Sequence, residues 1–258
     1  MLVRLVAAAV AAFSVVPLTH AAPGECSAKS GPGTAALVEL YTSEGCDSCP
    51  PADAWLRGLP APGGGGLVPL AFHVDYWDYI GWKDPFASPA FGARQRELAA
   101  ITRNRVVYTP QVVLAGRDYR SWGSGTRFTA DVQAVNATPA RAAIALELVT
   151  SQPGGAELRA SATVAKAEDR ANATLYVAMY ENGLSNKVTA GENRGATLQH
   201  DFVVREWWGP IALDRAGTTE LARKTGARGL ANGGVAAFVQ SRRTGDVLQA
   251  LALPACKG

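Results

Sequence analysis

The hydrophobic pattern of this sequence changes near residue 141, and that change constrains the fold more than any other feature. Before it, short apolar runs alternate with segments whose apolar residues recur at helical spacing. After it, apolar residues recur with a period of two, and Gly, Asn and Pro separate the runs. The first pattern predicts strands mixed with helices, and the second predicts strands alone. We therefore expect two domains, at 22–138 and 139–258, with the linker near Thr138-Pro139.

The part before residue 141 predicts the order strand, cysteine pair, helix, strand. Residues 35–43 and 67–77 are short and apolar, which is typical of buried strands. Between them lie Cys46 and Cys49, separated by two residues, and then a short helix that starts at Pro50-Pro51. Further along, the pattern predicts a helix at 90–103, a strand at 111–116 and a closing helix around 128–135.

The part after residue 141 predicts an all-β, sandwich-like domain. Several short strands separated by turn residues, with one weak helix near 219–224, are typical of that class. The expected strands lie at 144–148, 158–164, 175–179, 198–204, 235–240 and 247–253.

The amino-acid composition favours a globular protein and disfavours nucleic-acid binding and metal sites that need three histidines. Hydrophobic residues make up 48% of the chain and charged residues 18%, so the chain has ample material for a core. The basic residues are scattered, so we expect no nucleic-acid partner. Only His20, His73 and His200 are present, which disfavours sites that need three histidines, and we expect no cofactor.

Residues 1–21 have the features of a secretory signal. One cation, Arg4, precedes an uncharged apolar run, and Thr19 and Ala21 occupy the positions that favour cleavage after Ala21. The alternative is an N-terminal membrane anchor, but the run is shorter than the ~20 residues that span a bilayer. We expect a periplasmic or secreted protein with no membrane span after signal cleavage.

Export would let disulfides form and persist, so the four cysteines can be interpreted as pairs. The short spacer makes Cys46 and Cys49 the local pair, which leaves Cys26 and Cys256 to form a structural disulfide between the chain ends. The alternative for Cys26 and Cys256 is free or intermolecular thiols. For Cys46 and Cys49 it is a permanent structural disulfide.

A redox role would make Cys46 the attacking thiol and Cys49 the resolving one. Free backbone N–H groups at a helix start lower a thiol pKa, whereas the neighbouring Glu44 and Asp47 would raise it. Because these effects are of similar size, we expect the pKa of Cys46 to lie near the ordinary ~8.5.

Two other groups of side chains are candidates near the cysteine pair. His73 could complete a copper or zinc site with Cys46 and Cys49, although a satisfied core histidine is the commoner outcome. His200 is expected to be buried against a backbone partner where the two domains meet. An aromatic cluster is expected to form a substrate groove or to pack as a loop, and it contains Trp77, Tyr79, Trp82 and Phe86.

The order of elements around the cysteines resembles the thioredoxin fold, and the segment at 108–116 resembles the loop that carries a cis proline in such proteins. The resemblance implies a cis Thr109-Pro110 bond in contact with the cysteine turn, with Thr109 in the substrate groove and Pro110 in the catalytic set. Five ordered motifs are also similar to an exported bacterial family catalogued as domain of unknown function 1223. They are YTSEGCDSCPPAD, FHVDYWDYIGWKDPFASPAF, Arg94-Gln95, VYTPQVVLAGR and GENRGATLQHDFVVR.

Together these features predict an α/β thioredoxin-like domain followed by an all-β sandwich-like domain. The leading functional hypothesis is a periplasmic thiol-disulfide oxidoreductase that uses Cys46 and Cys49 on the protein thiols or disulfides of exported proteins. One alternative is a copper or zinc binding or delivery protein that uses Cys46, Cys49 and His73. Another is a non-enzymatic binding module with structural disulfides. The family resemblance itself implies no settled activity.

Overall fold

The computed structural model describes residues 25–62, 66–104, 106–151, 155–226 and 230–255. In these residues strands outnumber helices, with fourteen strands against four α-helices and two 3-10 helices. The elements are β1 (Glu25–Lys29), β2 (Ala36–Thr42), α1 (Pro50–Arg57), β3 (Leu67–His73), η1 (Asp75–Ile80), α2 (Pro89–Ile101), β4 (Gln111–Leu114), β5 (Arg117–Asp118), α3 (Gly125–Asn136), β6 (Ala143–Ser151), β7 (Gly155–Thr163), α4 (Ala167–Arg170), β8 (Ala173–Glu181), β9 (Leu184–Lys187), β10 (Thr197–His200), β11 (Val203–Ala212), β12 (Thr218–Gly226), η2 (Leu230–Asn232), β13 (Gly233–Ser241) and β14 (Val247–Pro254).

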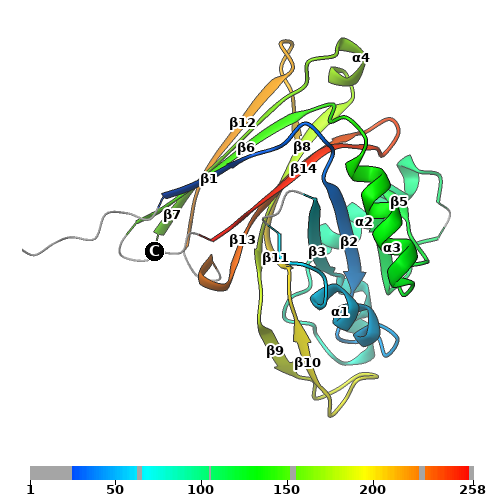
Figure 1. Ribbon diagram of the computed structural model, residues 1–258. Coiled ribbons are helices and arrows are strands. Elements are labelled where there is room, and N and C mark those ends of the chain that lie inside the picture. The colour runs from blue at the N-terminus through cyan, green and yellow to red at the C-terminus, as the bar shows by residue number, and fades with distance from the viewer. Residues whose placement is uncertain (1–24, 63–65, 105, 152–154, 227–229, 256–258) are drawn as a thin grey trace, which may run out of the picture.

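One sheet joins the two halves of the chain, which corrects the expected fold class. Its eight strands run in the order β14-β13-β8-β11-β3-β2-β4-β5, so strands from both sides of residue 139 are neighbours (Figure 1). The junction is the parallel pairing of β3 with β11, where Ala71 N donates to Phe202 O at 2.8 Å. The prediction of an α/β thioredoxin-like domain followed by an all-β sandwich-like domain is therefore wrong. The fold is sheet-rich, with few helices.

The physical reason is that the central strands of this sheet bury both faces. Alternate residues of β8 and β13 enter two different cores: Tyr176 and Phe238 face one, whereas Val177 and Val239 face the other. A strand buried on both sides needs a layer on each side. The second sheet, β1-β6-β7-β12, covers one side of these strands (Figure 1), and α2 lies on the other, where Arg94 reaches Tyr176 and Phe238.

A buried ion pair connects the helical layer to the sheet. Arg94 on α2 donates from Nε and Nη2 to the two carboxylate oxygens of Glu39 on β2, each at 3.2 Å. Its guanidinium also lies 4.7 Å from the ring centroid of Tyr176 and 5.3 Å from that of Phe238. Both charged side chains are almost fully buried. Each charge therefore offsets the free energy that the other loses by leaving water.

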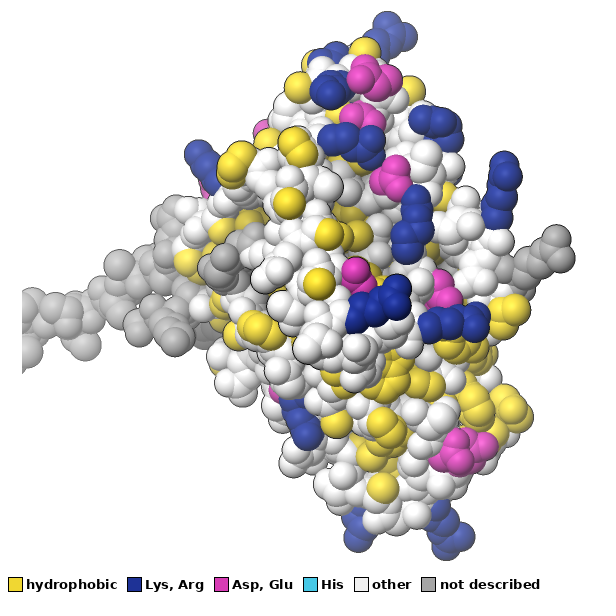
Figure 2. Space-filling model, turned by 45° about the vertical axis from the view of Figure 1, so that its right-hand side comes forward, with side chains coloured by type: hydrophobic (Ala, Val, Ile, Leu, Met, Phe, Trp, Pro, Cys, Tyr) yellow, Lys and Arg dark blue, Asp and Glu magenta, His cyan; other side chains and the backbone are white. Residues whose placement is uncertain are grey.

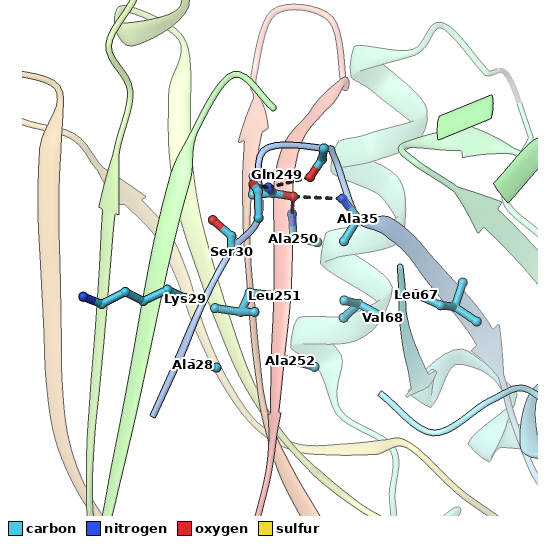
Figure 3. A pocket seen from close by; sticks show the side chains of 12 residues that line it. Ala28, Lys29, Ser30, Ala35, Leu67, Val68, Gln249, Ala250, Leu251 and Ala252 are labelled. Atoms are coloured by element: carbon cyan, nitrogen blue, oxygen red, sulfur yellow. Dashed lines mark hydrogen bonds between the residues drawn. The ribbon is translucent and has the colours of Figure 1, made fainter. Parts of the chain in front are cut away.

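The segment between β1 and β2 is held by one buried amide, Gln249 on β14. Its Nε2 donates to the carbonyl oxygens of Gly31 and Gly33, and its Oε1 accepts from Ala35 N at 2.9 Å (Figure 3). The backbone passes here from the four-stranded sheet to the eight-stranded one. These bonds satisfy polar groups that burial would otherwise leave unpaired.

Two predicted elements of the second half differ in the structure. Residues 219–224 lie within β12, an edge strand with one buried apolar side chain, Leu221, and not in a helix. The strand expected at 198–204 breaks at Phe202, whose φ is +58°, and becomes β10 and β11. The break lets β10 leave the large sheet and pair with β9 as a hairpin that reaches α1 at the lower end of Figure 1.

The surface carries both signs of charge. On the face shown in Figure 2, Lys and Arg side chains lie among Asp and Glu side chains, and hydrophobic side chains gather below them. Among the helices of the described residues, none is both long and apolar enough to cross a bilayer.

Candidate functional site: a cysteine turn under a hairpin

The cysteine turn lies where β2 ends and α1 begins. Cys49 is the N-cap residue of α1, and its carbonyl oxygen accepts from Ala52 N at 2.9 Å and Asp53 N at 3.1 Å. Pro50 takes the first helical position, where the N–H would have no partner in the helix. Cys46 lies three residues before the cap. The turn therefore places both thiols at the N-terminal end of the helix.

The two thiols are unbonded, and their pKa values are shifted in opposite directions. Cys46 Sγ lies 3.2 Å from Ser48 Oγ. A hydrogen bond from Cys49, and smaller contributions from Ser48 and Thr109, lower the pKa of Cys46 to about 6, against the opposing effect of burial. Burial and the hydrogen bond to Cys46 raise the pKa of Cys49. The expectation of an ordinary pKa for Cys46 is therefore wrong.

Glu44 does not act on Cys46 as its place in the sequence suggested, because its carboxylate is directed elsewhere. Its Oε2 accepts from Trp82 Nε1 at 3.0 Å and from Asn186 Nδ2 at 2.9 Å, and its Oε1 lies 3.1 Å from His200 Nε2. Asp47 is exposed. Neither carboxylate is among the principal causes of the Cys46 shift.

The proline loop before β4 lies against the same turn. The Thr109-Pro110 bond is cis, as predicted, and Thr109 O lies 3.9 Å from Cys46 Sγ. Trp77 Nε1 donates to Thr109 Oγ1 at 2.6 Å. The structure thus brings Trp77, Thr109 and the Cys46 thiol together. The catalytic role of Pro110 stays a prediction.

The other two groove candidates lie differently. The ring of Tyr79 stacks beside that of Trp77, with a centroid distance of 6.4 Å, and its side chain is 81% exposed. Trp82 is directed to Glu44 instead, where it helps to hold that buried carboxylate. Two stacked aromatic side chains, Trp77 and the exposed Tyr79, therefore lead outward from the cysteine turn.

The β9–β10 hairpin covers the cysteine turn, and sequence reasoning missed it. Asn193 Nδ2 donates to Glu44 O at 2.9 Å and to Cys46 O at 2.8 Å, and Glu192 Oε2 accepts from Asp47 N at 3.0 Å. In this arrangement neither cysteine is exposed. The available signal was the motif GENRGATLQHDFVVR, which contains both hairpin side chains.

A buried cluster of two histidines and three carboxylates lies beneath the turn. His73 Nδ1 is 2.7 Å from Asp84 Oδ2, His200 Nδ1 is 3.9 Å from Asp53 Oδ2, and the two imidazole centroids are 4.8 Å apart. Burial alone would lower the pKa of His73, but Asp84 raises it above its usual value. His200 is buried as expected, but its partners are carboxylates and not a backbone group.

The metal site with Cys46, Cys49 and His73 finds no support. His73 Nδ1 is engaged with Asp84, and its Nε2 has no hydrogen-bond partner. Within the described ranges no group of three or more His, Cys, Asp or Glu side chains is arranged to hold a metal ion.

Two predictions fall on parts that the structure does not describe. The signal segment, residues 1–21, lies outside the described residues, and so does Cys256. Cys26 Sγ lies 4.0 Å from the carbonyl oxygen of Pro254, two positions before Cys256. The Cys26–Cys256 disulfide therefore stays a prediction. Its formation requires β1 to lie near the end of β14, and these two strands are in contact.

Comparison with known proteins gives one family and two structural likenesses. A family model described as a protein of unknown function (DUF1223) matches residues 37–240. A crystal structure of a protein from Agrobacterium tumefaciens is similar, with 24% identity, a TM-score of 0.60 and coverage of 89% of this chain and 98% of that one. HBP35 of Porphyromonas gingivalis is similar with 14% identity, a TM-score of 0.66 and coverage of 89% and 77%. At these identities the likeness concerns the fold alone. No curated protein matches the chain.

Proposed function

We propose that this chain, which belongs to the DUF1223 family of proteins of unknown function, is a thiol-disulfide oxidoreductase. The observation that carries the proposal is the asymmetry of the cysteine turn. The pKa of Cys46 is lowered to about 6, whereas that of Cys49 is raised. At neutral pH the first is a thiolate, the nucleophilic form, and the second keeps its proton.

The chemistry follows from this asymmetry. Cys46 thiolate attacks one sulfur of a partner disulfide, forms a mixed disulfide and releases the partner's other sulfur as a thiolate. Cys49 then loses its proton and attacks the Cys46 sulfur, which breaks the mixed disulfide and releases the second partner thiolate. The partner is reduced by two electrons and the Cys46–Cys49 pair is oxidised. The reverse sequence oxidises a partner dithiol.

Reaction requires the hairpin to move away from the turn. Cys46 is fully buried under polar contacts from Asn193 and Glu192. Hydrogen bonds between partly exposed groups are worth about 0.5–1.5 kcal/mol each, so a few of them form a closure that thermal motion can open. Tyr79 is exposed beside the turn and offers a partner its first contact.

No observation favours either alternative, a binding module with structural disulfides or a copper or zinc protein. A permanent structural disulfide does not need opposite pKa shifts on its two sulfurs, and the cysteines are unbonded. A copper or zinc site needs Cys46, Cys49 and His73 arranged around one ion, and the described residues contain no such group.

The proposed partners are thiols or disulfides of exported proteins, and the proposed location is the periplasm or the exterior of the cell. Both rest on the signal-like features of residues 1–21. In such a compartment a dithiol pair can cycle between its two states, because disulfides persist there.

A trapping experiment tests the proposed function. Reduced Cys49→Ser protein is incubated with glutathione disulfide, and the adduct is located by peptide mass spectrometry. We expect one glutathione on Cys46 in this variant, a Cys46–Cys49 disulfide in the wild type, and no adduct in the matched Cys46→Ser control. Absence of the adduct in the Cys49→Ser variant, with the protein folded, overturns the proposal.

A further inference from the structure

The motif Arg94-Gln95 on α2 contains one residue that neither the core nor the cysteine turn explains. Arg94 forms the buried ion pair with Glu39. Gln95 is also buried, with 2% of its surface exposed. Burying an amide is costly unless its N–H and C=O groups find hydrogen-bond partners inside the protein. The place of those partners therefore indicates what Gln95 does.

The partners of the Gln95 nitrogen lie on both sides of the cis Thr109-Pro110 bond. Its Nε2 donates to the carbonyl oxygen of Tyr108 at 2.9 Å and to Oε1 of Gln111 at 2.8 Å. Tyr108 precedes the cis bond, and Gln111 follows it. A backbone carbonyl oxygen can only accept, so the NH2 end of the Gln95 amide must face the loop. One buried side chain thus holds the proline loop at both ends.

The oxygen of the same amide connects the loop to η1. Gln95 Oε1 accepts from the Tyr76 hydroxyl at 3.1 Å. Burial raises the pKa of Tyr76 to about 12, so this hydroxyl keeps the proton that it donates at neutral pH. The next residue, Trp77, donates to Thr109 Oγ1 at 2.6 Å. Gln95 and Trp77 therefore connect the same two segments, η1 and the proline loop.

Asp118 on β5 orients the side chains that flank the loop. Its Oδ1 accepts from the Tyr108 hydroxyl at 2.8 Å and from Gln111 Nε2 at 2.9 Å. Because the Gln111 nitrogen is engaged with this carboxylate, the Gln111 oxygen is turned toward Gln95. The loop is thus held from α2 and from β5 at once.

The position of this loop matters for the chemistry because Thr109 acts on the thiol. Thr109 O lies 3.9 Å from Cys46 Sγ. After the hydrogen bond from Cys49, bonds from Ser48 and from the Thr109 side chain also lower the pKa of Cys46. Hydrogen bonds weaken steeply with distance and misalignment, so the contribution of Thr109 depends on where the loop lies.

We propose that Gln95 is a positioning residue of the cysteine turn, whose amide holds the proline loop so that Thr109 stays against Cys46. The inference rests on the proposed function, because the thiolate that Thr109 favours is the proposed nucleophile. Gln95 acts through Thr109 and takes no part in the exchange of sulfur atoms. Its removal should therefore affect the thiol only as far as it displaces Thr109.

A double-mutant cycle tests this dependence. The pH midpoint of Cys46 alkylation by iodoacetamide is measured in Gln95→Met, in Thr109→Val and in the double variant. Each single substitution should raise the midpoint by about half a pH unit to one unit, since a hydrogen bond to a charged group is worth at most about two units. The double variant should match Thr109→Val, because the hydroxyl that Gln95 positions is then absent. Gln133→Met, the same substitution at an exposed glutamine of α3, should leave the midpoint unchanged.

Two results in folded variants overturn the inference. One is an unchanged midpoint in Gln95→Met, and the other is a pair of shifts that add in the double variant, since Gln95 would then act by another route than Thr109. If Gln95→Met does not fold, Gln95→Glu carries the same test. It keeps the size of the side chain and the bond from Tyr76, but it turns an oxygen toward the Tyr108 carbonyl. Absence of the glutathione adduct on Cys46 in Cys49→Ser overturns the proposed function instead, whatever the midpoints are.

Discussion

Replacing Cys49 by alanine should raise the pKa of Cys46, because the hydrogen bond from Cys49 is the largest cause of its low value. The shift from 9.0 to about 6 corresponds to about 4 kcal/mol of preference for the thiolate. One hydrogen bond to a charged group contributes about 1.5–3 kcal/mol of this, or roughly one to two pH units. The midpoint for Cys46 should therefore move to about 7–8 in Cys49→Ala. Cys49→Ser keeps a donor and should stay near the wild-type value.

The assay is the rate of Cys46 alkylation by iodoacetamide as a function of pH, followed by peptide mass spectrometry. The midpoint of the profile reports the pKa, and the plateau rate reports access to the sulfur. At pH 7 the thiolate fraction should fall from about nine-tenths in the wild type to between about one-tenth and one-half in Cys49→Ala.

Two results would refute this reasoning. One is an unchanged midpoint in Cys49→Ala, which would mean that Ser48, Thr109 and the helix terminus hold the thiolate without Cys49. The other is a lowered midpoint in Asp47→Asn, which would show that the flanking carboxylate acts on the thiol as the sequence alone suggests.

The other predictions concern the hairpin, the buried histidine and the core. Asn193→Ala removes two hydrogen bonds to the cysteine turn, so the plateau rate of alkylation should rise severalfold while the midpoint stays fixed; an unchanged plateau would show that the hairpin does not limit access. Asp84→Asn should flatten the dependence of unfolding free energy on pH near neutrality. Asp84 raises the pKa of His73 above its unfolded value of about 6.5, so the stabilisation is complete below that pH and is lost as pH rises through the folded pKa. Urea titrations of both proteins at several pH values measure this, and parallel curves would contradict it. Glu39→Gln leaves a buried guanidinium without its counter-charge and should cost about 3–5 kcal/mol in urea unfolding, whereas a loss below about 1 kcal/mol would contradict that account of the core.

Local features of the site were predictable because neighbouring residues determine them. A short apolar run, a cysteine pair, prolines and a second apolar run predict a turn between a strand and a helix wherever they occur. The cis bond at Thr109-Pro110 followed from a local resemblance and is present.

The shared sheet was not predictable from the same pattern. A period of two indicates which residues share a face of a strand, but it does not say which strand lies alongside. The alternation in β8 and β13 suggested one buried face, whereas the structure buries both, with the aromatic face directed to Arg94. Strands of one half could therefore complete the sheet of the other.

The charged surroundings of Cys46 could not be predicted from the sequence either, because closeness along the chain does not tell where a side chain points. Adjacency places Glu44 two residues from Cys46, but the backbone direction at the end of β2 sends its carboxylate to Trp82, Asn186 and His200. The residue that holds the Cys46 carbonyl, Asn193, lies 147 positions along the chain. The low pKa of the thiol arises mainly from Cys49 and Ser48 within the turn, with a contribution from Thr109, whereas its burial and its carboxylate neighbours depend on a distant hairpin. Reactivity and access are therefore set by separate parts of the chain, which is why the midpoint and the plateau of one alkylation profile should respond to different substitutions.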